Sequence, residues 1–228
     1  MSGHVIDPIS LQIHFQVLIE KLHLKERDGV ISEVKRLVSE AQIIGKPKTL
    51  YKASLIESKE DDGVVIDGLK LTSRVLRVNL ESAHRVFPFV ATCGRELEEW
   101  ASGIEDPFER YCAEAIKEMA LRMALKTLEG HLVKNYCEGS LSRMGPGSLA
   151  DWPLQEQTPL FKILGDTETA VGVRLTESLL MIPTKSISGI FFFSEMTFES
   201  CQLCPREGCP GRRAVYDKDL YDKRYRLQ

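Results

Sequence analysis

The sequence predicts an α+β fold in which helices, one of them long, flank a largely antiparallel sheet. Residues 106–136 carry one broad apolar face at helical spacing, which is typical of a long helix packed on another layer. Several other segments are rich in strand-forming residues. Helical and strand-like segments follow one another without the regular alternation of a parallel α/β protein, so we expect the strands to pair antiparallel.

The first hundred residues contain short elements of both kinds. Apolar residues at helical spacing predict a helix from about Ser10 and a second helix over residues 27–44. Pro88 predicts that the strand containing it lies at an edge of the sheet or is irregular, because proline has no amide hydrogen to donate to a neighbouring strand. The remaining predictions are a strand at 49–57, a hairpin of 64–66 with 69–71, a helix at 73–80, a strand at 85–92 and a helix at 95–101.

The long helix of residues 106–136 begins with Asp106 as its cap and Pro107 in the first position, where a missing amide costs nothing. Charged residues on its other face, among them Lys117 and Glu118, have the spacing of solvated helical pairs. Beyond it, the sequence predicts a short helix at 154–164 and strands at 171–175, 179–182 and 187–193.

Composition excludes several functional classes. The net charge of −3 leaves no basic footprint for nucleic acid. No apolar run approaches the roughly 20 residues that a membrane helix requires. The amino-terminal residues lack the basic and apolar regions of a signal peptide, so we expect a cytoplasmic protein. In a reducing compartment, the six cysteines indicate metal binding or buried thiols rather than disulfides.

A turn in the second half of the chain has the features of an anion site. Arg143 precedes Gly145-Pro146-Gly147-Ser148, and glycines allow backbone amides to approach a ligand closely. An arginine can hold a carboxylate or phosphate with two parallel bonds. Taken alone, the same residues also suit an ordinary loop in which Arg143 makes a surface contact.

Two motifs in the right order carry a resemblance to a known family. Arg143-x-x-Pro146-Gly147 is followed by Leu-Thr-Glu-Ser at 175–178, by Pro183, and by Ser-Ile-Ser-Gly at 186–189. This pattern resembles the activation domain of vitamin B12-dependent methionine synthase, over roughly residues 106–193. The resemblance implies that the turn binds S-adenosylmethionine, and that a carboxylate of the long helix, Glu118 or Glu129, could contact the ligand.

The resemblance assigns a role to each expected binding residue. Arg143 would hold the ligand carboxylate, and the 145–147 turn would approach ribose and adenine. Asp151, or else Glu156 or Glu177, would supply an acid. Ser186 and Ser188 would contribute hydroxyls, with Gly189 making room. Ser148 stands where the family usually has tyrosine, and Trp152 is the nearest aromatic substitute. The expected binding residues are Arg143, Gly145, Pro146, Gly147, Ser148, Asp151, Ser186, Ser188 and Gly189.

Three cysteines near the carboxyl end, Cys201, Cys204 and Cys209, are close enough in sequence to converge on one metal. We expect an iron–sulfur cluster in preference to zinc, because the neighbouring domain resembles a reductive activation module. A fourth ligand would come from Cys93 first, or from Cys112 or Cys137, or from an outside molecule. The alternative is three free thiols in a mobile tail.

These features predict one α+β domain with an appendage. Its amino-terminal part is residues 1–105, its activation-like core is 106–195, and its cysteine-rich tail is 196–228. The chain has no recognisable cobalamin-binding module, so we expect it to support remethylation of a separate corrinoid methyltransferase protein, with a donor such as a flavodoxin or ferredoxin. The methyl transfer needs no protein nucleophile, so no catalytic residue is expected. The alternative is a non-catalytic module that docks on a corrinoid protein and holds structural zinc.

Overall fold

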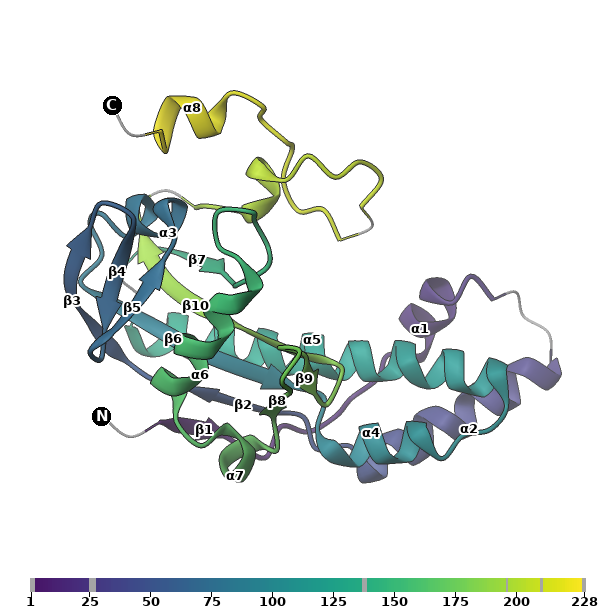
Figure 1. The fold of residues 1–228 in the computed structure, drawn as a ribbon. Coiled ribbons are helices and arrows are strands. Elements are labelled where there is room, and N and C mark those ends of the chain that lie inside the picture. Colours follow the sequence, from purple (N-terminus) through teal and green to yellow (C-terminus); the bar gives the residue numbers. More distant parts are fainter. Residues whose placement is uncertain (1–2, 25–27, 137–138, 196, 210, 227–228) are drawn as a thin grey trace.

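The computed structural model describes residues 3–24, 28–136, 139–195, 197–209 and 211–226, and it confirms the α+β prediction. In these residues an antiparallel sheet of eight strands is covered by helices, one of which is far longer than the rest (Figure 1). None of the described helices is long and apolar enough to cross a membrane.

Strand β6 is the hub of the sheet. One edge of β6 pairs with β10, and its other edge pairs first with β2 and then with β3. Beyond these, β10 pairs with β7, β2 with β1, and β3 with β4 and then β5, all antiparallel. The strands are β1 (His4–Ile6), β2 (Lys48–Tyr51), β3 (Ser54–Glu60), β4 (Gly63–Ile66), β5 (Leu69–Thr72), β6 (Arg85–Thr92), β7 (Ser140–Met144) and β10 (Ser186–Ser194), with β8 (Arg174–Leu175) and β9 (Met181–Ile182) as a separate pair.

Helix α5 links the two parts of the molecule. Its 30 residues give it a length of about 45 Å, so it covers the sheet with one half and extends beyond it with the other (Figure 1). The helices are α1 (Phe15–Lys21), α2 (Asp28–Ile44), α3 (Arg74–Asn79), α4 (Arg95–Ser102), α5 (Pro107–Tyr136), α6 (Gln157–Leu164), α7 (Thr167–Val171) and α8 (Leu220–Arg224), with 3₁₀ turns η1 (Leu154–Glu156) and η2 (Ser200–Leu203).

Alternate residues of β6 and β10 build a core on each face of the sheet. Phe87 and Phe89 of β6 pack with Phe191 of β10 under the second half of α5. Val90 and Ile190 point the other way, into a core made with α3 and α6. This period of two is the one expected of strands that are buried on both faces.

A third cluster of apolar side chains lies outside the sheet, among helices α1, α2, α4 and the first half of α5. Helix α5 therefore contributes Ile116 and Ala120 to the helical cluster, and Ala124 and Leu128 to the sheet. The small side chains of α5 allow the neighbouring layers to approach closely, as the sequence suggested.

The prediction that the 85–92 strand lies at an edge of the sheet is wrong. The carbonyl of Pro88 accepts a hydrogen bond from the Lys52 amide, so the Pro88 nitrogen faces the same side of the strand. On that side the neighbouring strand changes from β2 to β3, at residues 52 and 53. Because the ladder is already broken there, a proline fits in a central strand.

Other boundaries differ where contacts between distant residues decide the structure. The predicted 49–57 strand is divided into β2 and β3, and residues 167–171 form helix α7 where a strand was expected to begin. Strands β1 and β7 were not predicted. Both are short segments that are held by pairing with longer strands, a feature that local composition does not show.

The carboxyl end is anchored in the core. Tyr225 is fully buried, its hydroxyl donates to Asn79 at 3.1 Å, and its carbonyl accepts from Arg74 at 3.2 Å. At the other end of the tail, the amide of buried Phe198 donates to Ser142 of β7 at 2.8 Å. The described tail is therefore attached to the sheet at one end and to α3 at the other, and the short polar helix α8 precedes the second attachment.

Candidate functional site

A cavity of about 220 Å³ lies where the turn after β7 meets the start of β10 and the 3₁₀ turn η2. The turn after β7 and the yellow-green carboxyl-terminal segment lie on the same side of the sheet (Figure 1). The cavity is lined by Arg143, Met144, Gly145, Pro146, Ser148, Ile187, Ser188, Ser200, Cys201, Cys204 and Arg213. Two segments that the sequence singled out, the arginine turn and the cysteine cluster, thus form one wall each.

The turn is held close to β10 by its glycines. A side chain at Gly145 would place a Cβ atom 2.7 Å from the carbonyl oxygen of Ser188, so only glycine allows this approach. Gly147 has a φ of 80°, in the left-handed region that glycine favours. The Ser148 hydroxyl donates to the Gly145 carbonyl and closes the turn, a local role that the larger tyrosine of the family could not fill in the same way.

Arg143 is positioned by its strand. It pairs with Phe191 across β7 and β10, and its guanidinium lies 5.7 Å from the centre of the Phe191 ring. Its Nη1 atom is 3.6 Å from a carboxylate oxygen of Glu129 on α5, but it is buried and makes no hydrogen bond to any residue that the structure describes. Burial, followed by the charge of Arg213, lowers the pKa of Arg143 from its ordinary value.

Ser188 of β10 also has a buried hydroxyl that makes no hydrogen bond within the described chain, and the residue is only 6% exposed. Its side chain lies on the other face of the sheet from Arg143, because Arg143 pairs with Phe191 and Ser188 is three residues away from Phe191 on the same strand. A buried polar group without a partner destabilises a fold by about 1–3 kcal/mol. The Nη1 atom of Arg143 is the group of this kind that points to a ligand in the cavity.

A larger cavity of about 540 Å³ adjoins the first one. Both are lined by Arg143, Ile187, Cys201 and Arg213, so they form a continuous site. The two carboxylates that the resemblance nominated, Glu118 and Glu129, both line the larger cavity. Ligand sites for small molecules typically have volumes of about 300–1,000 Å³, so the joined cavities are large enough for a nucleoside with an amino-acid tail.

The structure brings together five of the nine predicted binding residues, namely Arg143, Gly145, Pro146, Ser148 and Ser188. Gly147 supports the turn but does not line the cavity. The other three residues are engaged elsewhere. The Asp151 carboxylate accepts from the Val75 amide at 2.9 Å and from the Ser73 hydroxyl, and so it organises the start of α3.

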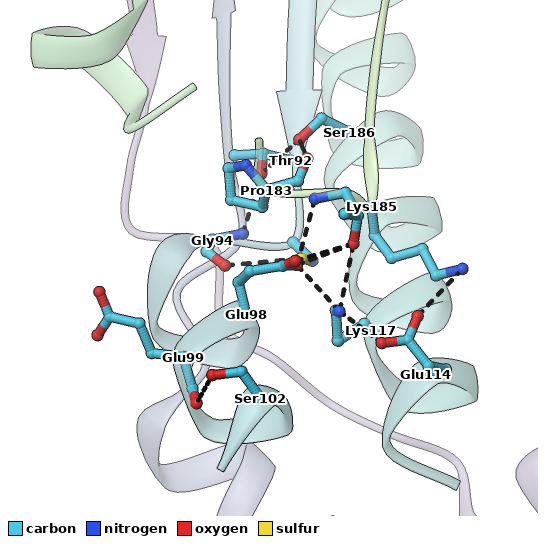
Figure 2. Close-up of polar contacts among 12 residues, drawn as sticks. Thr92, Gly94, Glu98, Glu99, Ser102, Glu114, Lys117, Pro183, Lys185 and Ser186 are labelled. Atoms are coloured by element: carbon cyan, nitrogen blue, oxygen red, sulfur yellow. Dashed lines mark hydrogen bonds and ion pairs between the residues drawn. The ribbon is translucent and has the colours of Figure 1, made fainter. Parts of the chain in front are cut away.

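Ser186 and Gly189 belong to the sheet rather than to the cavity. The Ser186 hydroxyl is shared between Thr92 Oγ1 at 2.9 Å and the Pro183 carbonyl at 2.7 Å (Figure 2). Gly189 allows the backbone of Met144 to come close, so it makes room for a strand and not for a ligand. Trp152, the suggested aromatic substitute, is fully buried in the core and lines neither cavity.

Gly189 provides a test of this packing. We expect Gly189→Ala to lower the free energy of unfolding by about 2 kcal/mol, because the added Cβ would collide with the Met144 carbonyl and part β7 from β10. Chemical denaturation of the two proteins measures the difference. Gly130→Ala, on helix α5 with open space around it, is the matched control and should be neutral or slightly stabilising. Equal stability of Gly189→Ala and the parent protein would contradict the assignment.

The cysteine segment, which we define as residues 200–209 with 211–214, is organised by an arginine. The Arg212 guanidinium donates to the carbonyls of Cys201 at 3.1 Å, Cys204 at 3.2 Å and Ala214 at 3.3 Å, and also to that of Arg206. Within the described residues, no three cysteine, histidine, aspartate or glutamate side chains are grouped to hold a metal. The expected donor set of Cys201, Cys204 and Cys209 is therefore not assembled here.

The other expected ligands are no better placed. Cys93 is fully buried in the helical cluster and lines neither cavity, and burial raises the pKa of its thiol to about 12. Cys112 is likewise buried, and burial raises its pKa to about 11. Cys137 lies outside the described residues. The ranking of Cys93 as the fourth ligand has no support in this geometry.

Cys201 differs from these buried cysteines. Its thiol is partly exposed, and its sulfur accepts a hydrogen bond from the Arg213 amide at 3.4 Å. Partial burial opposes ionisation, but the backbone amides of Arg213 and Ala214 and the Arg213 charge outweigh it and lower the pKa of Cys201. A carboxylate oxygen of Glu199 lies 2.8 Å from the Arg213 guanidinium, and the Glu199 backbone forms an isolated β-bridge with Arg143. These contacts fix the cysteine segment beside β7.

Lys117 was read from the sequence as a solvated charge, and that interpretation is wrong. Its side chain is only 3% exposed, and its ammonium lies 2.9 Å from Glu98 of α4 and 2.6 Å from Glu114 of α5. It also donates to the Thr184 hydroxyl at 3.3 Å. Figure 2 shows the Lys117 ammonium directed towards Glu98 and Glu114. Its ammonium is paired with two carboxylates and a hydroxyl, so the cluster offers no open position to a ligand. The cluster joins α4, α5 and the segment before β10.

A separate cavity of about 280 Å³ lies near β8 and β9. Two of its charged lining residues, Arg95 and Glu168, pair with each other at 2.8 Å. It contains none of the buried polar atoms that lack partners. The cavity at Arg143 is therefore the stronger candidate.

Comparisons with known proteins agree with this geometry. The family model described as "Vitamin B12 dependent methionine synthase, activation domain" matches residues 78–199. Among solved structures, the fold is similar to the MetH reactivation domain bound to AdoHcy, with a TM-score of 0.64 and 15% sequence identity, over 87% of this chain and 80% of that chain. No curated protein matches the sequence.

Proposed function

Because the chain belongs to the family of the vitamin B12-dependent methionine synthase activation domain, we propose that it binds S-adenosylmethionine and supports the reductive reactivation of a separate cobalamin protein. The neighbour with the same fold is bound to AdoHcy, the demethylated form of that molecule. The observation that carries the proposal is Arg143, which lines both cavities and whose buried Nη1 atom makes no hydrogen bond to the described residues.

The residues of the two cavities fit the parts of the ligand. A carboxylate is the anion that a buried guanidinium without a hydrogen bond would take, so we assign it to Arg143. Glu118 and Glu129 supply the negative charge that an ammonium or a sulfonium requires, on the side of the larger cavity. Gly145 and Pro146 provide the close backbone wall.

S-Adenosylmethionine supplies a methyl group that is already activated by its sulfonium. The work of this chain is therefore to bind the donor, orient it and exclude water from it. No side chain of the two cavities is required as a nucleophile. Cobalamin would be carried by the partner protein, and the electron donor, such as a flavodoxin or ferredoxin, would act from outside the chain.

The cysteines are not assigned a metal in this proposal. An iron–sulfur cluster or a structural zinc requires thiolates that converge on one point, whereas the interior of the cysteine segment holds the Arg212 guanidinium. Electron transfer through the segment is therefore left out. The same geometry of the described residues weakens the alternative of a zinc-containing docking module, which would also leave the buried Nη1 atom of Arg143 without a hydrogen bond.

The proposal predicts direct binding of the ligand. Titration calorimetry of the full chain with S-adenosylmethionine, and with S-adenosylhomocysteine, should give a Kd on the order of micromolar, or about −8 kcal/mol. Adenosine lacks the carboxylate and should bind far more weakly. The absence of any heat at millimolar concentrations of either ligand, from protein shown to be folded, would contradict the proposal and favour a docking role without a methyl donor.

A further inference from the structure

Two of the cysteines lie three positions apart in one tight turn. Cys201 belongs to the 3₁₀ turn η2, and Cys204 follows it directly. The Cys204 amide donates to the Cys201 carbonyl at 3.3 Å, which closes the turn. Residues joined in this way have Cα atoms within about 7 Å of each other, and a disulfide spans about 4.4–6.8 Å between Cα atoms. The backbone therefore places the two cysteines at a separation that a disulfide bond can span.

A single arginine also holds the backbone carbonyls of this pair. One nitrogen of the Arg212 guanidinium donates to the Cys201 carbonyl at 3.1 Å, and another donates to the Cys204 carbonyl at 3.2 Å. Because the guanidinium is planar and rigid, it fixes the two carbonyls relative to each other. This contact is independent of the hydrogen bond within the turn, and it brings the same two residues together.

The pair can be reached from the smaller cavity. Cys201 and Cys204 both line that cavity, and each is partly exposed. The Cys201 sulfur accepts a hydrogen bond from the Arg213 amide, which favours the thiolate, the form that attacks a disulfide. The two buried cysteines of the helical cluster have no such access, and Cys209 lines neither of the two joined cavities.

We propose that Cys201 and Cys204 form a dithiol that exchanges reversibly with small disulfides entering the smaller cavity, and that becomes an internal disulfide when it is oxidised. The pair is then a redox-sensitive element in the wall of the ligand site. The inference goes beyond the proposed function and requires no methyl donor. Its one link to that function is that a ligand in the cavity should hinder the exchange.

The reaction takes two exchange steps. The Cys201 thiolate attacks one sulfur of the small disulfide, a mixed disulfide forms, and the first small thiolate leaves with the electron pair. The Cys204 thiolate then attacks the Cys201 sulfur, the bond between the two cysteines forms, and the second small thiolate leaves. Each departing thiolate takes up a proton that a cysteine has released. The two cysteines are oxidised and the small disulfide is reduced to two thiols, so no other oxidant is needed.

The small, uncharged reagent 2-hydroxyethyl disulfide tests the proposal on the full chain. The reduced protein is incubated with this disulfide and varied amounts of 2-mercaptoethanol, the remaining thiols are blocked with N-ethylmaleimide, and the tryptic peptides are identified by mass spectrometry. Trypsin cleaves after Arg206, so Cys201 and Cys204 share one peptide and Cys209 lies in the next. An internal disulfide of the pair stays within a single peptide, whereas a bond to Cys209 joins two peptides.

We expect the internal disulfide of Cys201 and Cys204 to be at least about tenfold more abundant than any bond to Cys209, because one turn holds the pair at a high effective concentration. Cys209→Ser should retain this disulfide. Cys204→Ser cannot complete the second step, so the mixed disulfide should accumulate at Cys201.

The buried cysteines of the helical cluster report on folding in the same experiment. They should stay unmodified before digestion in the parent protein and in both variants, which shows that each remains folded. If Cys201 and Cys204 stay reduced in the folded parent protein under excess disulfide, the proposal is overturned. Bonds to Cys209 that are as abundant as the internal disulfide would overturn it as well.

Protection by ligand distinguishes this inference from the proposed function. S-Adenosylhomocysteine should slow formation of the mixed disulfide at Cys201 in the Cys204→Ser variant and leave Cys209 unaffected. An internal disulfide that forms in a protein without calorimetric binding of S-adenosylhomocysteine would support the dithiol and count against the methyl-donor site. Calorimetric binding by a protein whose Cys201 and Cys204 stay reduced would support the proposed function and overturn the dithiol.

Discussion

Replacement of Arg143 by alanine is expected to raise the Kd for S-adenosylhomocysteine at least about 30-fold. Removing one partner of a buried, charge-assisted contact costs about 2 kcal/mol or more, and every 1.4 kcal/mol changes affinity about tenfold. The Nη1 atom of Arg143 is buried, lies 3.6 Å from Glu129 and makes no hydrogen bond to the described residues, so a ligand carboxylate in the cavity would supply that bond. Titration calorimetry of parent and variant measures the change.

Two further variants test whether the effect is specific. Arg143→Lys keeps the positive charge but loses the two parallel bonds of a guanidinium, so it should fall between the parent and Arg143→Ala. Arg226→Ala makes the same change of charge outside both cavities, at a side chain that is 72% exposed, and should bind almost normally. Equal affinities for Arg143→Ala and Arg226→Ala would remove Arg143 as the anchor.

Lys117→Met is expected to produce the largest loss of stability, about 3 kcal/mol. Removal of one partner from a buried ion pair leaves carboxylates that are still partly desolvated, and this typically costs about 3–5 kcal/mol. Glu98 is 24% exposed and Glu114 41% exposed, so the value should lie at the low end of the range. For a chain of this size the midpoint of thermal unfolding should fall by about 6–12 °C.

Lys126→Met, on the exposed face of the same helix, is the matched control for Lys117. It removes an equal charge and should change the free energy of unfolding by no more than about 0.5 kcal/mol. Thermal and denaturant unfolding of both variants and the parent measure the difference. If the two substitutions have the same effect, the cluster shown in Figure 2 does not stabilise the junction of α4 and α5.

The effect of Lys117→Met should also depend on pH. Burial raises the pKa of Glu114, but Lys117 and Lys185 outweigh it and lower this pKa from 4.5. The ionised Glu114 carboxylate therefore stabilises the fold above pH 4.5, and this stabilisation is lost as the pH falls through the lower pKa of the folded state. Burial lowers the pKa of Lys117, but the carboxylates of Glu114 and Glu98 outweigh it and raise this pKa above 10.5. The charged Lys117 therefore stabilises the fold below pH 10.5, and this stabilisation is lost at higher pH. The difference between parent and variant should therefore be largest between these two pH values.

The sequence by itself determined the features that depend on neighbouring residues. Ser73 caps α3 and Asp106 precedes α5, because capping and apolar periodicity act within a few residues. The Arg143 turn was identified by its resemblance to a family motif, because its arginine, proline and glycines alone also suit an ordinary loop. Five of the predicted binding residues line the cavity.

Only the tertiary structure decided which residues meet across long stretches of chain. Asp151 was expected to face a ligand, yet it organises α3, 78 residues away at Ser73. Lys117 has the spacing of a surface residue, but Glu98 and Thr184, from two other segments, enclose it. The cysteine segment lies beside Arg143 because Phe198 and Tyr225, on either side of it in the chain, are buried in the apolar core. Burial and pairing are properties of the packed chain, and the residues that cause them are too far apart in sequence to form a local pattern.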